Sequence, residues 1–320
     1  MTQILRALPF AAASLVLISL SSAQEIKWTN EGGNNNFSDP ANWSGGNVPT
    51  GDQAGLINLS KEEKAVFNTA SNQNFNGLNI GSKGRGEFWV AGGTFTATKN
   101  AARSTIVGLR KGVGIMGQLG GEVHVNHLQL GVGKGSTGVY TVRGGSLALA
   151  RAKGEFSLSI GDGGKGSFEM RKGSLKMRRG VVLGNNGGVG GFTVYGSSIE
   201  EIGIGSHNKL DGSWMQNAGS VLKAVVDEGG ITKIFIDDPE NDGVGGDVTF
   251  EKKSVLDCDF AGPKQSGSWV LMEWEGKLLK KGLVLSPEAK KAGWSFSFED
   301  LGVNGKVKGP DSLVIRFKAK

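Results

Sequence analysis

The residues best suited to bind a ligand are basic and lie between positions 143 and 179, where nine Lys or Arg residues outnumber three acids. We select Arg143, Arg171, Lys176 and Arg178 as candidate ligand-binding residues. Arg143 and Arg171 hold the same place in successive copies of the repeat described below, so we expect them about 4.8 Å apart on neighbouring strands. Because facing like charges repel, an anion such as a uronate, a sulfate or a lipid phosphate would stabilise the pair. The alternative is that these side chains extend into water and only oppose aggregation.

Trp89 is the candidate for stacking against a sugar ring. It alternates with Phe88 and Val90 in the run EFWV, so its indole is predicted on the outer side of a strand whose neighbours point inward. Two interpretations remain open. The indole is either an exposed platform for a sugar or is covered by the N-terminal segment, because large apolar groups are seldom left bare.

Metal binding and catalysis have weaker support in the sequence. The run IDDPENDGVGGD offers Asp238, Asp242 and Asp247 as oxygen ligands for calcium, but it lacks the EF-hand spacing, and a solvated loop is the alternative. His124 and His127 lie three residues apart on a predicted strand, so they should point to opposite faces and not share a metal. The sequence contains no G-x-S-x-G motif and no phosphate-binding loop. We therefore predict no catalytic residue and no cofactor.

The elements that must position these candidates form a glycine-punctuated unit, which recurs six times between residues 78 and 222. Each copy has an apolar-x-apolar-Gly start, a glycine-rich link, a middle strand that ends near a Gly-Gly pair, and a last short strand. The first glycines are 21 to 30 residues apart and comprise Gly81, Gly108, Gly131, Gly161, Gly184 and Gly205. This period is typical of solenoids, in which each copy forms one coil of a stack.

Alternation within each copy predicts apolar columns that run through the stack. The middle strands contribute Phe88, Met116, Tyr140, Phe168, Phe192 and Trp214, followed two residues later by Val90, Gln118, Val142, Met170, Val194 and Gln216. The first strands contribute Ile80, Val107, Leu130, Ile160, Leu183 and Ile204, and the last strands contribute Phe95, Val123, Leu147, Leu175, Ile199 and Val221. Three columns per coil predict a triangular core, with glycines turning the chain at its corners.

The flanking segments are predicted to close the two ends of the stack. Residues 24–77 are rich in Asn and Gly and read as an N-terminal cap, whereas residues 223–320 read as a β-rich closing region of longer antiparallel or irregular strands. Within the latter, SPEAKKAG has a Ser cap and a Gly stop and predicts a helical turn. The only cysteine, Cys258, alternates with apolar residues and is predicted to be a buried thiol.

The first 23 residues predict a cleaved secretory signal peptide, with Arg6 before an apolar run and small residues before Gln24. The apolar run is too short to span a bilayer, so we expect no transmembrane segment in the mature chain. An extracellular or cell-surface location follows, with the periplasm as the alternative. The net charge of +6 suits an anionic polysaccharide or a cell-envelope component as partner. Self-association is a further expectation, and nucleic acid is not expected for an exported chain.

The run WTNEGGNNNFSDPANWSGGNVPTGDQAGLIN, the repeats, and the later order GGITKIFI, GDVTFEKKSVLDCDF and GSWVLMEWEG together resemble secreted bacterial β-solenoid proteins related to autotransporter-associated strand repeats. The resemblance implies an exported parallel β-helix and supplies no catalytic residues. The expected fold is all-β: a single-stranded right-handed parallel β-helix with an N-terminal cap and a C-terminal β-rich closing region.

Two functions are compatible with these observations. A non-catalytic structural or adhesive module explains every feature of the repeats. A polysaccharide lyase or another carbohydrate-active enzyme is the alternative, because parallel β-helices often host that chemistry, but fold analogy carries most of that case. The sequence favours the non-catalytic module.

Overall fold

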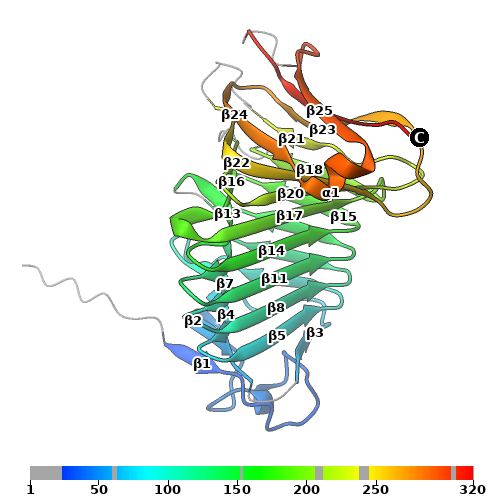
Figure 1. Cartoon of the computed structure of the whole chain (residues 1–320). Coiled ribbons are helices and arrows are strands. Elements are labelled where there is room, and N and C mark those ends of the chain that lie inside the picture. The colour runs from blue at the N-terminus through cyan, green and yellow to red at the C-terminus, as the bar shows by residue number, and fades with distance from the viewer. Residues whose placement is uncertain are drawn as a thin grey trace, which may run out of the picture.

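The computed structural model describes residues 24–59, 63–151, 154–205, 212–237, 245–303 and 308–319, so the predicted signal peptide lies outside the described residues. Within these ranges the chain is all-β, apart from the α-helix α1 (Pro287–Ala292) and two short 3-10 turns, η1 (Pro40–Asn42) and η2 (Asn185–Gly187). The strands form one 17-stranded and one nine-stranded sheet. Figure 1 shows an elongated stack that runs from β1 at one end to β24 and β25 at the other.

Most strands fall into three series, in each of which every strand is parallel to the next. The first series contains β1 (Glu25–Lys27), β2 (Gly51–Ile57), β4 (Phe75–Ser82), β7 (Ser104–Leu109), β10 (His127–Val132), β13 (Phe156–Ile160), β16 (Gly180–Leu183) and β19 (Ser213–Gln216). The second contains β3 (Ala65–Phe67), β5 (Arg85–Val90), β8 (Val113–Gln118), β11 (Thr137–Val142), β14 (Lys165–Met170), β17 (Val189–Tyr195) and β20 (Val221–Val226). The third contains β6 (Thr94–Ala97), β9 (Glu122–Val125), β12 (Ser146–Leu149), β15 (Gly173–Met177), β18 (Ile199–Ile204), β21 (Ile234–Ile236) and β23 (Gly267–Trp274).

One long strand joins the first two series near the C-terminal end. The 14 residues of β22 (Asp247–Phe260) pair with β19 through their first part and with β20 through their last. The strand β24 (Leu278–Leu285) then pairs with β22, also in parallel. Antiparallel pairing joins β23 to β26 (Ser312–Phe317) and β26 to β25 (Trp294–Glu299). The closing region therefore continues the parallel pairing before it turns antiparallel.

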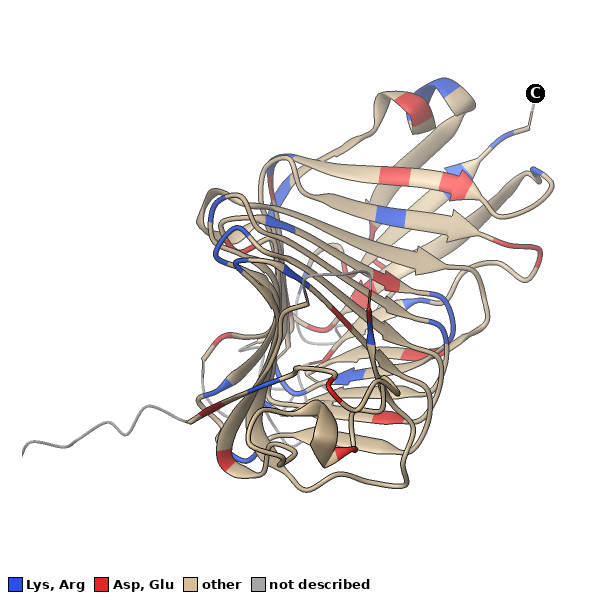
Figure 2. Cartoon of the chain, turned by 90° about the horizontal axis from the view of Figure 1, so that it is seen from below, with Lys and Arg blue, Asp and Glu red and all other residues tan. Residues whose placement is uncertain are grey.

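The first and middle columns are confirmed through the first five copies of the repeat, and the third column through the first four. In the fifth copy Ile202, and not the predicted Ile199, pairs with Leu175, because the strand has a register shift at its start. Phe88, Met116, Tyr140, Phe168 and Phe192 pair in register along the second series. All five are buried, and the aromatic rings of the last three contact one another in sequence. The three series contribute to one hydrophobic core. Figure 2 shows the same strands from below, along the direction in which they stack. This arrangement is compatible with a parallel β-helix.

The predicted register of the sixth copy is wrong by one strand. Ile199 and Ile204 both belong to β18, a third-series strand with a register shift at its start. The first strand of the sixth copy is instead β19, where Trp214 pairs with Val181. The run IGIG imitates the start of a repeat because its alternation is the same, although it ends the fifth copy. In the sixth copy the middle column is occupied by Leu222 and Ala224, the first by Gln216 and the third by Ile234.

The repeated glycines have a steric cause, which Gly138 illustrates. A Cβ atom at Gly138 would lie 2.0 Å from the carbonyl oxygen of Val107 and 2.4 Å from the backbone nitrogen of Gly131. Gly131 has a φ of +68° and turns the chain from the first series into the second. The second-series strand thus begins directly against the turn of the copy beside it, and only glycine fits there.

The ends of the stack differ in structure. At the N-terminal end, Trp28, Phe37 and Trp43 pack together, and the indole of Trp43 donates to the Phe37 carbonyl at 2.7 Å. At the C-terminal end the predicted helical turn is confirmed as α1, where the hydroxyl of Ser286 accepts from the backbone of Ala289 at 3.1 Å. In the described part of the chain, no helix is long and apolar enough to cross a membrane.

Candidate functional site

Trp89 lies on the outer side of β5, as predicted, and is held in a fixed orientation. Its indole nitrogen donates to Glu87 at 2.8 Å, and Glu87 also accepts from Arg85 at 2.7 Å. The ring lies over Gly117 of the next strand, where a Cβ atom would come within 2.3 Å of the ring carbons. The absence of a side chain at Gly117 therefore lets the indole lie against the outer surface of the second series. The indole is half-buried.

Arg143 follows β11 and reaches the same area, with its guanidinium carbon 5.9 Å from the centre of the Trp89 ring. The ammonium nitrogen of Lys64 lies 5.8 Å from the centre of the same ring. Leu119 lies on the strand position next to Arg143 and is 50% exposed. A flat aromatic ring, an exposed apolar group and two cations thus share one outer surface, and both cations are within range of weak cation–π attraction.

Arg171 points away from Arg143 and has two partners of its own. Its guanidinium carbon lies 4.0 Å from the centre of the Tyr195 ring, and its Nε donates to Glu169. The two arginines are neighbours in the ladder, since β11 and β14 pair in register, but each turns toward a different aromatic ring. Their repulsion is therefore relieved within the protein. An anion between them would be an additional ligand rather than a structural requirement.

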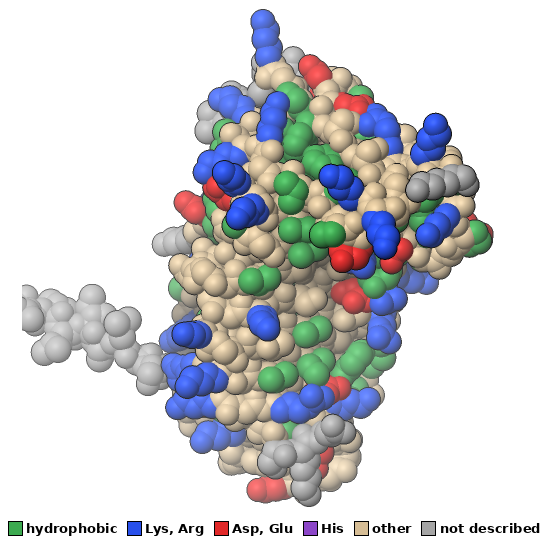
Figure 3. All heavy atoms as spheres, viewed as in Figure 1, with side chains coloured by type: hydrophobic (Ala, Val, Ile, Leu, Met, Phe, Trp, Pro, Cys, Tyr) green, Lys and Arg blue, Asp and Glu red, His purple; other side chains and the backbone are tan. Residues whose placement is uncertain are grey.

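We call these five residues the platform: Trp89, Leu119, Arg143, Arg171 and Tyr195. Sequence reasoning missed Leu119 and Tyr195. In the repeat alignment, Leu119 and Tyr195 occupy the same position as Arg143 and Arg171, directly after the inward column that begins at Val90. The alignment that paired the two arginines therefore also indicated that Leu119 and Tyr195 lie on the same outer surface. In Figure 3, which views this face, hydrophobic side chains lie between Lys and Arg side chains that gather mainly toward its edges.

The other two basic candidates are not part of the platform. Lys176 lies on the outer side of β15 in the third series and pairs with Glu201 at 2.9 Å. Arg178 follows β15 on the same side, next to Ala150 in the ladder, and is half-buried. The predicted basic surface is thus two surfaces on different series of strands.

A pocket of about 560 Å³ lies where α1 overhangs the outer face of the second series. Its charged lining residues are Lys223, Asp257, Asp259 and Glu288. Asp257 accepts from Ser286 at 2.5 Å and pairs with Lys223 at 3.1 Å. Burial lowers the pKa of Lys223, but the hydrogen bond and charge of Asp257 outweigh that effect, so its pKa is raised. Lys223 consequently stays protonated and is a poor base.

The two histidines of HVNH lie on successive strands rather than on one strand. His124 is on the outer side of β9 and contacts Glu122 at 3.2 Å. His127 begins β10 and is buried between the hydroxyls of Ser104 and Ser159, at 3.1 and 3.0 Å. Burial, together with the charge of Arg151, lowers the pKa of His127 to about 3. The pair Ser104 and His127 has the reach of a nucleophile and its base, but so weak a base would activate the hydroxyl poorly.

The remaining candidates have simple structural outcomes. Asp238 and Asp242 of the calcium hypothesis lie outside the described residues, and Asp247 accepts a hydrogen bond from the backbone of Lys277 at 2.7 Å. Among the described residues, no group of three or more His, Cys, Asp or Glu side chains comes together as metal ligands. Cys258 is buried, as predicted, and burial raises the pKa of its thiol to about 12.

No protein family, curated protein or solved structure matches this chain. The function is therefore inferred from the chemistry of its own surfaces.

Proposed function

We propose that this protein is an exported, non-catalytic structural or adhesive β-solenoid that binds an anionic glycan or another anionic cell-envelope component through the platform. The observation that carries the proposal is the pairing of an outward aromatic ring with an arginine at both ends of the platform, Trp89 with Arg143 and Tyr195 with Arg171. Aromatic rings offer flat faces to sugar rings, and guanidinium groups bind carboxylates and sulfates.

The proposed architecture is a single-stranded right-handed parallel β-helix. Three series of parallel strands around one core are what such a helix requires, and parallel crossovers are right-handed in about 98% of cases. The order of the strands supports it, because the chain visits the first, second and third series in turn in each copy. Export to the cell surface or beyond rests on the predicted signal peptide, and the resemblance to autotransporter-associated repeats agrees with it.

The shape of the platform favours an extended ligand. Trp89 and Tyr195 lie on β5 and β17, which are separated by three strands of the second series, and so they are about 19 Å apart along the stack at 4.8 Å per strand. A polymer chain that follows the stack would contact both aromatic–arginine pairs, whereas a single sugar would contact one. We therefore expect affinity to rise with the length of the glycan.

Binding assays with polygalacturonate, a sulfated polysaccharide and a neutral polysaccharide test this proposal. We expect the two anionic polymers to bind, and more weakly as salt is raised. Trp89→Ala should weaken binding about tenfold, and the double variant Arg143→Ala/Arg171→Ala should weaken it further. A matched double variant, Lys99→Ala/Lys134→Ala, removes two exposed cations outside the platform and should bind as the unmodified protein does. Unchanged binding by Arg143→Ala/Arg171→Ala would overturn the proposal.

A carbohydrate-active enzyme such as a polysaccharide lyase is the second candidate, favoured by the pocket beneath α1. Asp257 and Asp259 alternate on the same side of β22, about 6.8 Å apart along the strand, and Glu288 faces them from α1. Two carboxylates on one side of a strand are the residue types that act on a glycosidic bond. The raised pKa of Lys223 weighs against a lyase base. Release of unsaturated or reducing ends from these polymers, abolished by Asp259→Asn, would favour the enzyme.

A further inference from the structure

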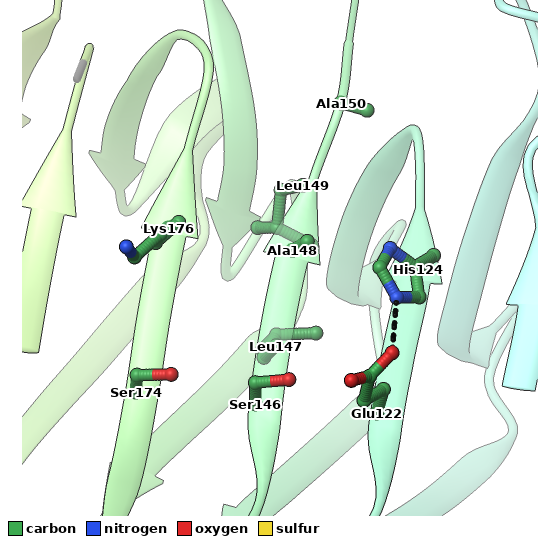
Figure 4. A pocket seen from close by; sticks show the side chains of 9 residues that line it. All are labelled: Glu122, His124, Ser146, Leu147, Ala148, Leu149, Ala150, Ser174 and Lys176. Atoms are coloured by element: carbon green, nitrogen blue, oxygen red, sulfur yellow. Dashed lines mark hydrogen bonds and ion pairs between the residues drawn. The ribbon is translucent and has the colours of Figure 1, made fainter. Parts of the chain in front are cut away.

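The outer face of the third series contains a groove that the platform does not use. The groove has a volume of about 410 Å³ and crosses three parallel strands, β9, β12 and β15. Figure 4 shows its side chains: Glu122 and His124 on one side, Lys176 and Ser174 on the other, and the residues of β12 between them.

The groove is hollow because the outward residues of β12 are small. In the ladder, Ala148 stands between His124 and Lys176, and Ser146 stands between Glu122 and Ser174. The inward residues of the same strand, Leu147 and Leu149, are buried in the core, so the backbone of β12 is held at the level of its neighbours. The floor is therefore rigid, and only the length of the outward side chains makes the depression.

The two walls differ in charge. Glu122 contacts His124 at 3.2 Å, with 56% of its side chain exposed. Lys176 is paired with Glu201 outside the groove, and half of each side chain is exposed, at 50% and 45%. An ion pair this exposed contributes little to stability, so a ligand carboxylate can take over the ammonium group at little cost.

A second cation follows Lys176 on the same wall. Arg178 stands beside Ala150 in the ladder, and Ala150 lines the groove. The Nε of Arg178 is buried and has no hydrogen-bond partner in the part of the chain that the structure describes. Arg178 as a whole is half-buried, and its positive charge adds to that of Lys176 beside the groove.

We propose that this groove binds one uronic-acid sugar unit of an acidic glycan. Lys176 receives the sugar carboxylate, the exposed carboxylate of Glu122 accepts from sugar hydroxyls, and the C–H face of the ring lies on Ala148. The ligand class follows from the distance across the ladder, because a ring that carries a carboxylate on one side and hydroxyls on the other matches walls of opposite charge two strand spacings, or about 9.6 Å, apart. This inference rests on the proposed function only for the class of polymer, because the residues of the groove are not those of the platform.

Calorimetric titration of the full chain with trigalacturonate, and with a neutral galactose trimer as reference, tests the groove. We expect trigalacturonate to bind and the neutral trimer to bind at least tenfold more weakly, which corresponds to about 1.4 kcal/mol. Ala148→Leu fills the floor without changing charge, and Lys176→Gln removes the cation. Each should weaken trigalacturonate binding about tenfold. The matched control is Lys233→Gln, which breaks an ion pair with Glu273 further along the third series.

The platform variant Trp89→Ala separates this proposal from the previous one. Trigalacturonate binding that survives Trp89→Ala but is lost in Ala148→Leu supports the groove. Binding that survives Ala148→Leu and is lost in Trp89→Ala overturns the groove and leaves the platform standing. If trigalacturonate does not bind while polygalacturonate does, the groove is again overturned. Circular dichroism and melting temperature of each variant verify that the fold is intact.

Discussion

Two buried glutamines, Gln118 in the central strands and Gln216 near the C-terminal end, differ in how completely their side chains are hydrogen-bonded. Both side chains are fully buried, and both amides donate to two backbone carbonyls. Gln118 donates to Gly121 in its own turn at 3.1 Å and to Ser146 in the next copy at 2.9 Å. Its Oε1 accepts from the hydroxyl of Tyr140 at 2.9 Å. Every polar atom of this side chain has a partner.

Gln216 repeats only half of this arrangement. It donates to Ser220 at 2.8 Å and to Val255 at 2.8 Å, again one carbonyl in its own turn and one in the neighbouring strand. Within the described residues, its Oε1 has no hydrogen-bond partner, and neither does the indole nitrogen of Trp214 beside it. The hydrogen bonding of Gln118 in the central strands is therefore complete, whereas the site of Gln216 and Trp214 leaves one buried acceptor and one buried donor unpaired. We infer that the central strands are the more stable part of the stack.

The largest expected effect comes from the central aromatic column. Phe168 is fully buried between Tyr140 and Phe192, with ring centres 5.6 and 5.0 Å away. Phe168→Ala should lower the free energy of unfolding by about 3–5 kcal/mol, through lost burial and the cavity that remains. Urea denaturation measures this loss. Val189→Ala, at an outer position that is 47% exposed, is the control and should change stability by less than about 0.5 kcal/mol. A loss below about 1 kcal/mol for Phe168→Ala would contradict a continuously packed column.

The second prediction concerns acid, because the central strands also bury His127. Its folded pKa of about 3 lies below the ordinary value of 6.5, so the folded state disfavours the protonated ring. The stability that neutral His127 provides is complete above pH 6.5 and is lost as the pH falls toward 3, at about 1.4 kcal/mol per pH unit. Unfolding free energies measured from pH 7 to 4 should show this slope. His127→Gln should flatten it, and equal slopes in the two proteins would refute the role of His127.

The smallest effect tests the comparison of the glutamines directly. Tyr140→Phe leaves the Oε1 of Gln118 without a partner and so makes the central site resemble the C-terminal one. We expect a loss of about 1–2 kcal/mol, the cost of a buried acceptor left unpaired. In a double-mutant cycle, Gln118→Leu and Tyr140→Phe should show coupling. Gln216→Leu should cost less than Gln118→Leu, because Gln216 has no such hydroxyl partner among the described residues. Equal losses would remove the distinction between the two regions.

The repeats were predictable from the sequence because the direction of each side chain and the position of each turn depend on residues close by in the chain. Alternation assigns Phe88 and Val90 to the interior and Trp89 to the exterior, and the structure confirms all three. The turning glycines, such as Gly131, have the expected positive φ. The cap of α1 at Ser286 is equally local and equally confirmed. Local alternation failed at Ile204, because a third-series strand that ends in IGIG has the same pattern as the start of a new copy.

The sequence by itself determined which residues face the core, where the chain turns and that parallel strands would stack, because each depends on neighbours within a few residues. Only the tertiary structure decided which outer surface each basic side chain belongs to. Arg143 joins Trp89 across two strands, Arg171 joins Tyr195, and Lys176 lines a separate groove. The direction in which a long side chain leaves a strand depends on what the adjacent copies place beside it, such as the missing side chain at Gly117. That information is spread over three copies of the repeat, so no single copy contains it.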